Sequence, residues 1–308
     1  MTPAEARALA AAVLQVPATA AVPCRGGLLN EVFRVTLDGG RTVIVKHAPP
    51  HIASQPSVPL DPARSGFEAD ALRALSGRAA PRLRTPRLLG QRGHSIVIED
   101  LGDLPDLRAW LSSGGDRGVI DTLARGLCAL HARDDTPHTH NLPIQQTRLV
   151  VQYQSIGPTL AALGVPDAAA LGQRAVALGE ALLAPGDTFV MGDLWPPSVL
   201  VDRGRLSLID WEMSTRGRRC QDVGHLVAHL WLDAARGTIP AGLAARFLDA
   251  YGPLPAPDRA QVAVHAAAEV LVRVAGPFSA DPPDPPRVQR AALDFALTAL
   301  RQGTLCLR

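Results

Sequence analysis

The chain has 308 residues and a mass of 32.5 kDa, which is enough for one large domain or for two lobes. Hydrophobic residues make up 47% and charged residues 19%, a composition that excludes a disordered or fibrous protein. With 31 basic and 29 acidic residues the net charge is +2, which argues against a strongly basic nucleic-acid-binding protein.

The N-terminal residues predict a helix rather than a targeting segment. Thr2 can cap a helix and Glu5 can close a capping box, and no stretch approaches the roughly 18 apolar residues of a membrane span. Four widely spaced cysteines favour a reduced protein over a disulfide framework. They are Cys24, Cys128, Cys220 and Cys306. We therefore expect a cytoplasmic protein without a membrane partner.

The next elements in chain order form the pattern of a β-hairpin. A first helix is expected up to about Leu14, and strand-like runs follow at Glu31–Leu37 and Arg41–Lys46. The short turn Asp38-Gly39-Gly40 joins these runs, as in an antiparallel hairpin.

A second helix and two more strands are expected before residue 100. A proline-rich loop over residues 49–60 leads to Asp61-Pro62, which can open a helix. Short strands are expected at Arg87–Leu89 and His94–Glu99. The first hundred residues therefore have the pattern of a small antiparallel β-rich unit.

Beyond Asp103 the chain changes to long helical patterns that short strands interrupt once. Helices are expected at Gly118–Ala132, Thr147–Leu163, Ala168–Leu183, Asp222–Leu232, Gly242–Tyr251, Ala260–Val274 and Arg287–Arg301. The strands are expected at Phe189–Met191, Val199–Val201 and Leu206–Ile209. We predict an α+β fold with a β-rich lobe over residues 1–100 and a larger helical lobe over residues 101–308.

One basic residue differs from all the others. Of the 31 basic residues only Lys46 is a lysine, and it lies at the end of a strand-like run. An ammonium group is a compact charge with three donors, and a planar guanidinium does not fit the same position. A GC-rich coding bias could produce the excess of arginine, but it would not by itself explain why one lysine remains in a strand-like run, and the alternative is an ordinary lysine at a strand end.

Carboxylates follow two other strand-like runs. One run stops at Gly192-Asp193 before a proline-rich loop, and a later run ends at Asp210-Trp211-Glu212. One acid in such an arrangement can accept the proton of a hydroxyl group, and the others can hold a hard divalent cation. The alternative is a set of ordinary turn aspartates.

The order of these motifs resembles the aminoglycoside phosphotransferase/choline kinase superfamily, whose members are small-molecule kinases with a protein-kinase-like, two-lobed fold. The resemblance rests on Gly192-Asp193 with Ser198, on Asp210-x-Glu212 and on Asp222 at a helix start. It covers residues 22–235 well and the C-terminus more weakly.

The resemblance implies a nucleotide site for ATP between the two lobes. Lys46 would contact the α- and β-phosphates, Glu68 would hold Lys46, and the connector at Glu99–Leu101 would lie against the adenine. The cofactor-binding residues implied are Lys46, Glu68, Gly26, Gly27, Asn30, Glu99 and Leu101.

The resemblance also implies a catalytic acid and a Mg²⁺ site. Asp193 would accept the proton of the acceptor hydroxyl, Asp210 and Glu212 would ligate Mg²⁺, and Asp222 would accept backbone N–H groups of the catalytic loop. Ser198 stands where the family usually has asparagine, and its hydroxyl would be a weaker ligand.

Some details resemble methylthioribose kinase-like members of the superfamily. These are the stretch that begins at Lys46, the serine at Ser198 and the run His265–Gly276, although Val272 stands where the first arginine of a pair is expected. The substrate residues implied are Arg273, Trp195 and Trp211. Core packing of a tryptophan is the alternative.

Several functions stay open at this point. The acceptor could be a methylthioribose-like sugar, an aminoglycoside, choline or homoserine, and the chain could be a monomer or a homodimer. A kinase-like nucleotide-binding module without activity is a second class, because Met191 and Ser198 depart from the family pattern. A metal-dependent hydrolase that uses the same acids is a third class.

His225 and His229 have the i, i+4 spacing that can bind zinc on a helix. No third ligand is near them in sequence, so we expect packed histidines.

Overall fold

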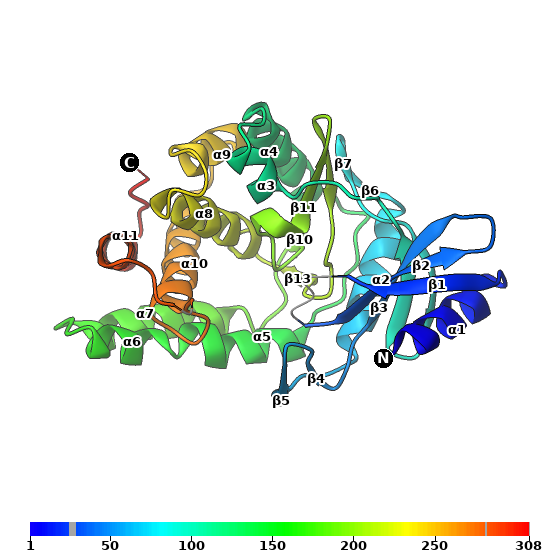
Figure 1. The fold of residues 1–308 in the computed structure, drawn as a ribbon. Helices are drawn as coiled ribbons and strands as arrows, with labels where there is room; N and C mark the ends of the chain where they lie inside the picture. Colours follow the sequence, from blue (N-terminus) through cyan, green and yellow to red (C-terminus); the bar gives the residue numbers. More distant parts are fainter. Residues whose placement is uncertain (25–28, 281, 308) are drawn as a thin grey trace.

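The computed structural model describes residues 1–24, 29–280 and 282–307. Its β-rich part and its helical part lie at opposite ends of the molecule (Figure 1). In the β-rich part, five strands form an antiparallel sheet in the order β1-β2-β3-β9-β8. These strands are β1 (Ala18–Pro23), β2 (Glu31–Leu37), β3 (Thr42–His47), β8 (Leu88–Arg92) and β9 (Ser95–Glu99).

Helices contact the two faces of this sheet. Helix α1 (Pro3–Leu14), which has the expected capping box, packs against the side chains of Val35 and Val45. Successive side chains of a strand point to opposite faces, so Lys46 lies on the face away from α1. Helix α2 (Arg64–Leu75) is on that face, and it begins three residues after the predicted opening at Asp61.

Six strands of the described residues were not predicted, and two of them are β1 and β13 (Thr215–Gly217). The pair β4 (His51–Ile52) and β5 (Gln55–Pro59) lies in the expected proline-rich loop. The pair β6 (Arg78–Ala80) and β7 (Leu83–Arg84) lies between α2 and β8. Strands of two or three residues are too short to show a period of two, and the prolines of β5 argue against a strand.

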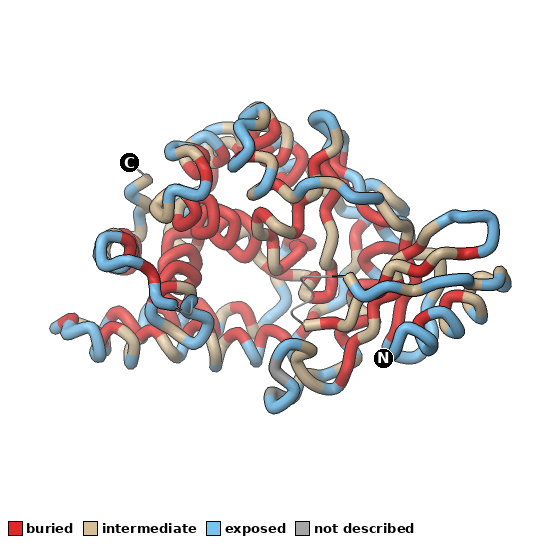
Figure 2. The backbone as a smooth tube through the Cα atoms, viewed as in Figure 1, coloured by how far each residue is buried: buried red, intermediate tan, exposed pale blue. Residues whose placement is uncertain are grey.

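The helical part follows the expected pattern closely. Its helices are α3 (Leu107–Ser112), α4 (Gly118–His131), α5 (Leu142–Arg148), α6 (Ile156–Ala162), α7 (Ala168–Ala181), α8 (Cys220–Ala235), α9 (Leu243–Tyr251), α10 (Ala256–Val274) and α11 (Pro286–Gln302). Helices α8 and α10 lie at its centre and are buried along most of their length (Figure 2).

The prediction of one continuous helix over Thr147–Leu163 was wrong. The structure divides this range into the end of α5, a π-helical turn at Leu149–Tyr153, and α6. Pro158 supplies the physical reason, because it has no N–H and its ring would clash with the carbonyl group of Gln154 in a continuous α-helix.

Four strands of the helical part carry the acidic motifs. They are β10 (Thr188–Val190), β11 (Val199–Asp202), β12 (Arg205–Leu208) and β13 (Thr215–Gly217). β10 pairs with β13, which places the segment before Asp193 beside the segment after Asp210. The hairpin β11–β12 continues into β7 and β6 as one four-stranded sheet.

The architecture is the predicted α+β fold with two lobes of the kinase-like kind. The four-stranded sheet crosses the predicted lobe boundary near residue 100, because β7 comes before the boundary and β12 after it. The two lobes therefore share a core, in which Leu83 packs in the same cluster as Leu127 and Leu206. None of the helices in the described ranges combines the length and the low polarity that crossing a bilayer requires.

Candidate active site

Lys46 lies at the centre of an ion-pair cluster between the lobes. Its Nζ is 2.8 Å from Glu68 Oε1 of α2 and 2.8 Å from Oδ1 of Asp210, which follows β12. Lys46 and Glu68 are buried, whereas the side chain of Asp210 is 44% exposed. The cluster therefore has a buried end at Glu68 and an open end at Asp210.

The charges of this cluster depend on one another. Burial alone would lower the pKa of Lys46, but the carboxylates of Asp210, Glu68 and Glu212 raise it above its ordinary value. Burial raises the pKa of Glu68, and Lys46 opposes this effect. Burial likewise raises the pKa of Glu212 to about 7. Lys46 therefore stays positively charged, and the three acids around it outnumber its single charge.

Two side chains donate hydrogen bonds to the same carboxylate oxygen of Glu212. Asn30 Nδ2 donates to Glu212 Oε2 over 2.9 Å, and Arg64 Nε donates to the same oxygen over 3.2 Å. The Oδ1 of Asn30 is buried and has no hydrogen-bond partner in the described part of the chain. Oxygens of Asp210, Glu212 and Asn30 are the donor type that a hard divalent cation prefers, so these residues fit such an ion.

Asp193 lies on a loop whose backbone requires glycine. Gly192 has φ 83°, and a Cβ at this position would be 2.3 Å from the carbonyl oxygen of Met213. The fully buried carboxylate of Asp222 accepts the N–H groups of Met191 over 2.9 Å and of Gly192 over 2.7 Å. These are the contacts that the sequence analysis expects of Asp222. His131 Nε2 lies 3.0 Å from the same carboxylate.

The Asp193 carboxylate faces an arginine and a histidine and remains accessible. Arg148 of α5 donates to it over 3.3 Å, and Nε2 of His225 lies 3.2 Å away. Burial alone would raise the pKa of Asp193, but His225, Arg148 and Arg273 lower it to about 2. The side chain is 26% exposed, so an ionised carboxylate is available to an incoming hydroxyl group.

Replacing Asp222 tests its structural contacts. We expect Asp222→Ala to lower the free energy of unfolding, because each buried donor left without an acceptor costs about 1–3 kcal/mol. Urea unfolding measures the change, with Asp294→Ala on the exposed side of α11 as the control. Equal stability of the two variants would contradict the importance of these bonds.

Ser198 and Trp211 differ from their predicted roles. The Ser198 hydroxyl donates to the Trp195 carbonyl over 2.8 Å and accepts from the Trp195 N–H over 3.2 Å, so its geometry closes its own turn and gives no support to a metal ligand. The substrate prediction for Trp211 was wrong, because its side chain is fully buried and stacks on Phe189 at 6.0 Å. A ring without exposed surface cannot contact an acceptor.

Trp195 and Arg273, the two other predicted substrate residues, lie together near Asp193. The guanidinium groups of Arg108 and Arg273 are 5.6 Å and 5.8 Å from the centre of the Trp195 ring. Arg273 also lies 5.5 Å from the ring of Phe278. Trp195 is two residues after Asp193, so these cations and rings form a wall beside the Asp193 loop.

The predicted nucleotide residues of the hairpin and connector have mixed outcomes. Gly26 and Gly27 lie outside the described residues. The Glu99 carboxylate accepts the N–H of Arg87 over 3.2 Å and lies 3.6 Å from Arg84, so this side chain is already engaged. Leu101 is half-buried in the connector.

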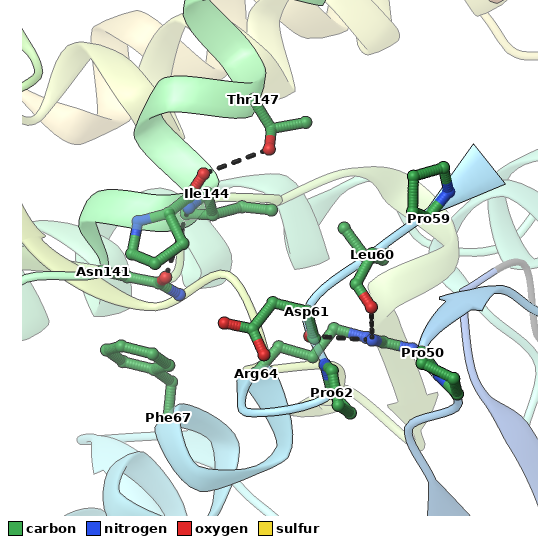
Figure 3. Close-up of a pocket in the computed structure, with 11 residues that line it drawn as sticks. Pro50, Pro59, Leu60, Asp61, Pro62, Arg64, Phe67, Asn141, Ile144 and Thr147 are labelled. Atoms are coloured by element: carbon green, nitrogen blue, oxygen red, sulfur yellow. Dashed lines mark hydrogen bonds between the residues drawn. The ribbon is translucent and has the colours of Figure 1, made fainter.

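A cavity of about 350 Å³ adjoins the site on the side of α5 (Figure 3). Phe67 of α2 and Ile144 and Thr147 of α5 line it. Arg64 lines the same cavity and reaches Glu212, and Arg148, which contacts Asp193, follows Thr147 in α5. Helix α5 therefore separates this cavity from the Asp193 loop.

Sequence reasoning missed two residues beside Asp193, which are Arg148 and His225, and the acid Glu269 that lies next to His225. Arg148 had no role assigned, His225 was expected only as a packed histidine, and Glu269 was not considered. The i, i+4 spacing of His225 and His229 was the one available signal, but the acid that completes the cluster lies on another helix, 40 residues beyond His229. No sequence spacing connects helices at that distance.

Comparisons with known proteins agree with this geometry. The model of the family described as "Phosphotransferase enzyme family" matches residues 20–265. A curated relative, 4-hydroxytryptamine kinase of Psilocybe cyanescens, is 25% identical over 241 residues. The match covers 68% of this chain and 66% of the relative, so the chain spans slightly less than two thirds of that protein.

Solved structures share the fold at low identity. A choline/ethanolamine kinase family protein from Mesorhizobium loti has a TM-score of 0.56 and 17% identity, over 97% of this chain and 94% of that chain. A spectinomycin phosphotransferase, solved with ADP and spectinomycin, has a TM-score of 0.58 and 11% identity, over 98% of each chain. At this identity the likeness concerns the fold alone.

Proposed function

The chain belongs to the phosphotransferase enzyme family, and from this premise we propose that it transfers the γ-phosphate of ATP to a hydroxyl group of a small molecule. One observation carries the proposal: the single lysine binds Glu68 and Asp210 at 2.8 Å each, and the strand pair β10–β13 brings Asp193 to the same region. Phosphoryl transfer requires this combination of a cation, metal-binding acids and an acid for the acceptor.

Lys46, Asp210 and Glu212 form the nucleotide side of the proposed reaction. Lys46 would bind the α- and β-phosphates, and Asp210 and Glu212 would hold Mg²⁺. A bound Mg²⁺ supplies neutralisation of the charge on the transferring phosphoryl group. The excess of acids around Lys46 supports this role, because a divalent cation would offset it.

Asp193 would orient the acceptor rather than act as a strong base. A carboxyl group with a pKa of about 2 binds a proton weakly, but it accepts a hydrogen bond from a hydroxyl group and directs the oxygen toward the phosphorus. In a loose transition state little negative charge develops on the attacking oxygen before the O–P bond forms. The hydroxyl proton then passes to Asp193 late in the reaction.

The side chains that form the wall beside Asp193 indicate what kind of acceptor could bind. Trp195 is partly exposed and its two arginine neighbours leave guanidinium N–H groups near the ring, so this wall suits a compact acceptor with polar groups and a flat or ring-shaped body. The names of the relative and of the neighbouring structures point to hydroxyl compounds that carry amines. A methylthioribose-like sugar is supported only by the motif details of the sequence.

A panel assay tests the proposal. Purified protein is incubated with Mg-ATP and with a hydroxytryptamine, spectinomycin, choline, homoserine, methylthioribose and a metabolite extract, and mass spectrometry identifies the species that gains a phosphate. The Asp193→Ala variant is the control. We expect a phosphorylated product with the wild type only.

Two further measurements, the Tm with and without Mg-ATP and phosphate release from esters without ATP, separate the two competing classes. A nucleotide-binding module would show a rise in Tm with Mg-ATP and no phosphorylated product in any mixture. A metal-dependent hydrolase would release phosphate from esters without ATP and would not depend on Lys46. Either result would contradict the proposed kinase function.

Replacing Trp195 tests the acceptor wall. We expect Trp195→Ala to raise the KM for the acceptor by about 2–10-fold with an unchanged KM for ATP, because an aromatic contact contributes ~0.5–1.5 kcal/mol. Trp110→Ala on α3 is the matched control and should leave both constants unchanged. Equal effects on the two KM values would show that Trp195 acts through stability rather than through acceptor contact.

A further inference from the structure

Four side chains from three elements converge on Glu269, an acid of α10 that is only 3% exposed. Arg273 Nε donates to Oε1 over 2.7 Å, and Gln152 Nε2 of the π-helical turn donates to Oε2 over 2.9 Å. His229 Nε2 lies 3.1 Å from Oε1, and His225 Nδ1 lies 3.6 Å from Oε2. So many donors around a buried acid indicate that Glu269 is ionised.

His225 connects this buried acid to Asp193. Its Nε2 lies 3.2 Å from Asp193 Oδ1, and its Nδ1 faces Glu269. Both ring nitrogens of His225 are buried, and neither meets the geometry of a hydrogen bond with a partner in the described residues. Asp193, His225, Glu269 and Arg273 form a continuous row of side chains.

We propose that His225 is a positioning residue for the phosphoryl transfer, because its ring lies between Asp193 and Glu269 and orients the Asp193 carboxylate toward the acceptor hydroxyl. This inference rests on the proposed role of Asp193. His225 acts through the carboxylate of Asp193.

The other titratable groups around His225 come from the loop of Asp193 and from three helices. They are Asp193 of the catalytic loop, Arg148 of α5, His229 of α8, and His265, Glu269 and Arg273 of α10. Burial lowers the pKa of His229 to about 4 and the pKa of His265 well below its ordinary value, so both rings are neutral near pH 7. Burial would raise the pKa of Glu269, but His225 and Arg273 hold it well below its ordinary value.

A metal ion is the competing occupant of this cluster. Ligand atoms of His225, His229 and Glu269 lie within 4.8 Å of one another, as in a zinc site. However, Arg273 Nε is 2.7 Å from one Glu269 oxygen and Gln152 occupies the other. A divalent cation would be repelled by the guanidinium group and would displace both bonds, so the ion-pair row accounts better for the geometry.

The row also joins Asp193 to the acceptor wall. Arg273 donates to Glu269 and at the same time lies over the ring of Trp195. The acid that would orient the acceptor hydroxyl and the wall that would hold the acceptor body are therefore supported by the same buried carboxylate. Loss of His225 should change kcat, whereas the KM for ATP should stay the same.

Replacing His225 with glutamine tests the proposal, because glutamine removes the imidazole ring that lies between the two acids. We expect His225→Gln to lower kcat by about 10–100-fold through misorientation of Asp193. We also expect the pKa of Asp193 to rise toward about 4, the ordinary aspartate range, because His225 lowers it in the wild type. The acid inflection of kcat/KM that comes from Asp193 should then lie near pH 4 in the variant and below about pH 3 in the wild type. The inflection expected near pH 7 from Glu212 is common to both proteins.

His229→Gln is the matched control. His229 lies one turn further along α8 and contacts the same Glu269, but its contacts in the described residues do not include Asp193. Because the His229 ring is neutral near pH 7, its loss removes no charge that faces Asp193. We expect the pH dependence of this variant to match that of the wild type.

A second measurement does not require activity. The ¹³C signal of the Asp193 carboxyl group is titrated by NMR in the wild type, His225→Gln and His229→Gln, with His225→Asn as the substitute if His225→Gln does not fold. A raised pKa of Asp193 in the His225 variants alone supports the proposal, and an unchanged pKa overturns it. Absence of kinase activity in the wild type would contradict the proposed function, and the titration would still decide the role of His225.

Discussion

Asp193→Asn is expected to lower kcat by about 10²–10⁴-fold, the range that a positioned acid–base group contributes. Asparagine keeps the size of the side chain but cannot accept the hydroxyl proton. It also leaves Arg148 and His225 facing a neutral group, so the acceptor hydroxyl loses both its partner and its orientation.

The affinity for Mg-ATP should change little in the same variant, because the groups that would bind the nucleotide are Lys46 and the acids around it. Turnover is measured with the acceptor found in the panel assay, and Mg-ATP binding by calorimetry. Asp202→Asn in the β11–β12 hairpin is the control for a general effect of removing an aspartate. Retained turnover in Asp193→Asn would remove Asp193 from the reaction.

Lys46, Asp193 and Asp210 could be singled out from sequence because each lies at or near the end of a strand-like run. Lys46 is the next-to-last residue of β3, and Asp210 follows the short apolar strand β12. Their roles were implied by the resemblance of the motif order to a known family. The structure brings Lys46 and Asp210 together at 2.8 Å. These positions could be predicted because the residues that form each strand are adjacent in the sequence.

The roles of Trp211 and Ser198 could not be predicted because they depend on packing. The sequence places Trp211 between two acids, which suggests an exposed position, yet Phe189 of a distant strand covers its ring. The Ser198 hydroxyl is used by the turn that follows Trp195. Neither a covering ring nor a local turn bond leaves a spacing pattern, so the sequence could not distinguish a ligand from a packed side chain.

The sequence did not reveal that one sheet contains strands of both lobes, for a similar reason. The parallel pair β7–β12 joins residues more than one hundred positions apart, and β7 has two residues. Its consequence for the site is direct, because β12 ends just before Asp210. A strand of the N-terminal half therefore helps to fix the position of an acid supplied by the C-terminal half.

Lys46→Arg is expected to lower kcat/KM for ATP by about 30–1000-fold, since disturbing one partner of a buried charge pair costs about 2–4 kcal/mol. One nitrogen of Lys46 meets Glu68 and Asp210 at 2.8 Å each inside a buried site. A guanidinium group is larger and spreads its donors over a planar fork, so it cannot contact both acids from the same point. The Lys46→Arg variant keeps the positive charge but loses the position from which one nitrogen contacts both acids.

This substitution separates geometry from charge, which an alanine variant would not do. Steady-state kinetics over a range of ATP concentrations measures the effect, and Arg205→Lys on the exposed edge of β12 is the control for a conservative exchange in a strand. A silent Lys46→Arg variant would show that any cation serves at this position. The presence of one lysine among so many arginines would then carry no information about nucleotide binding, and the role proposed for Lys46 would fail while that of Asp193 would stand.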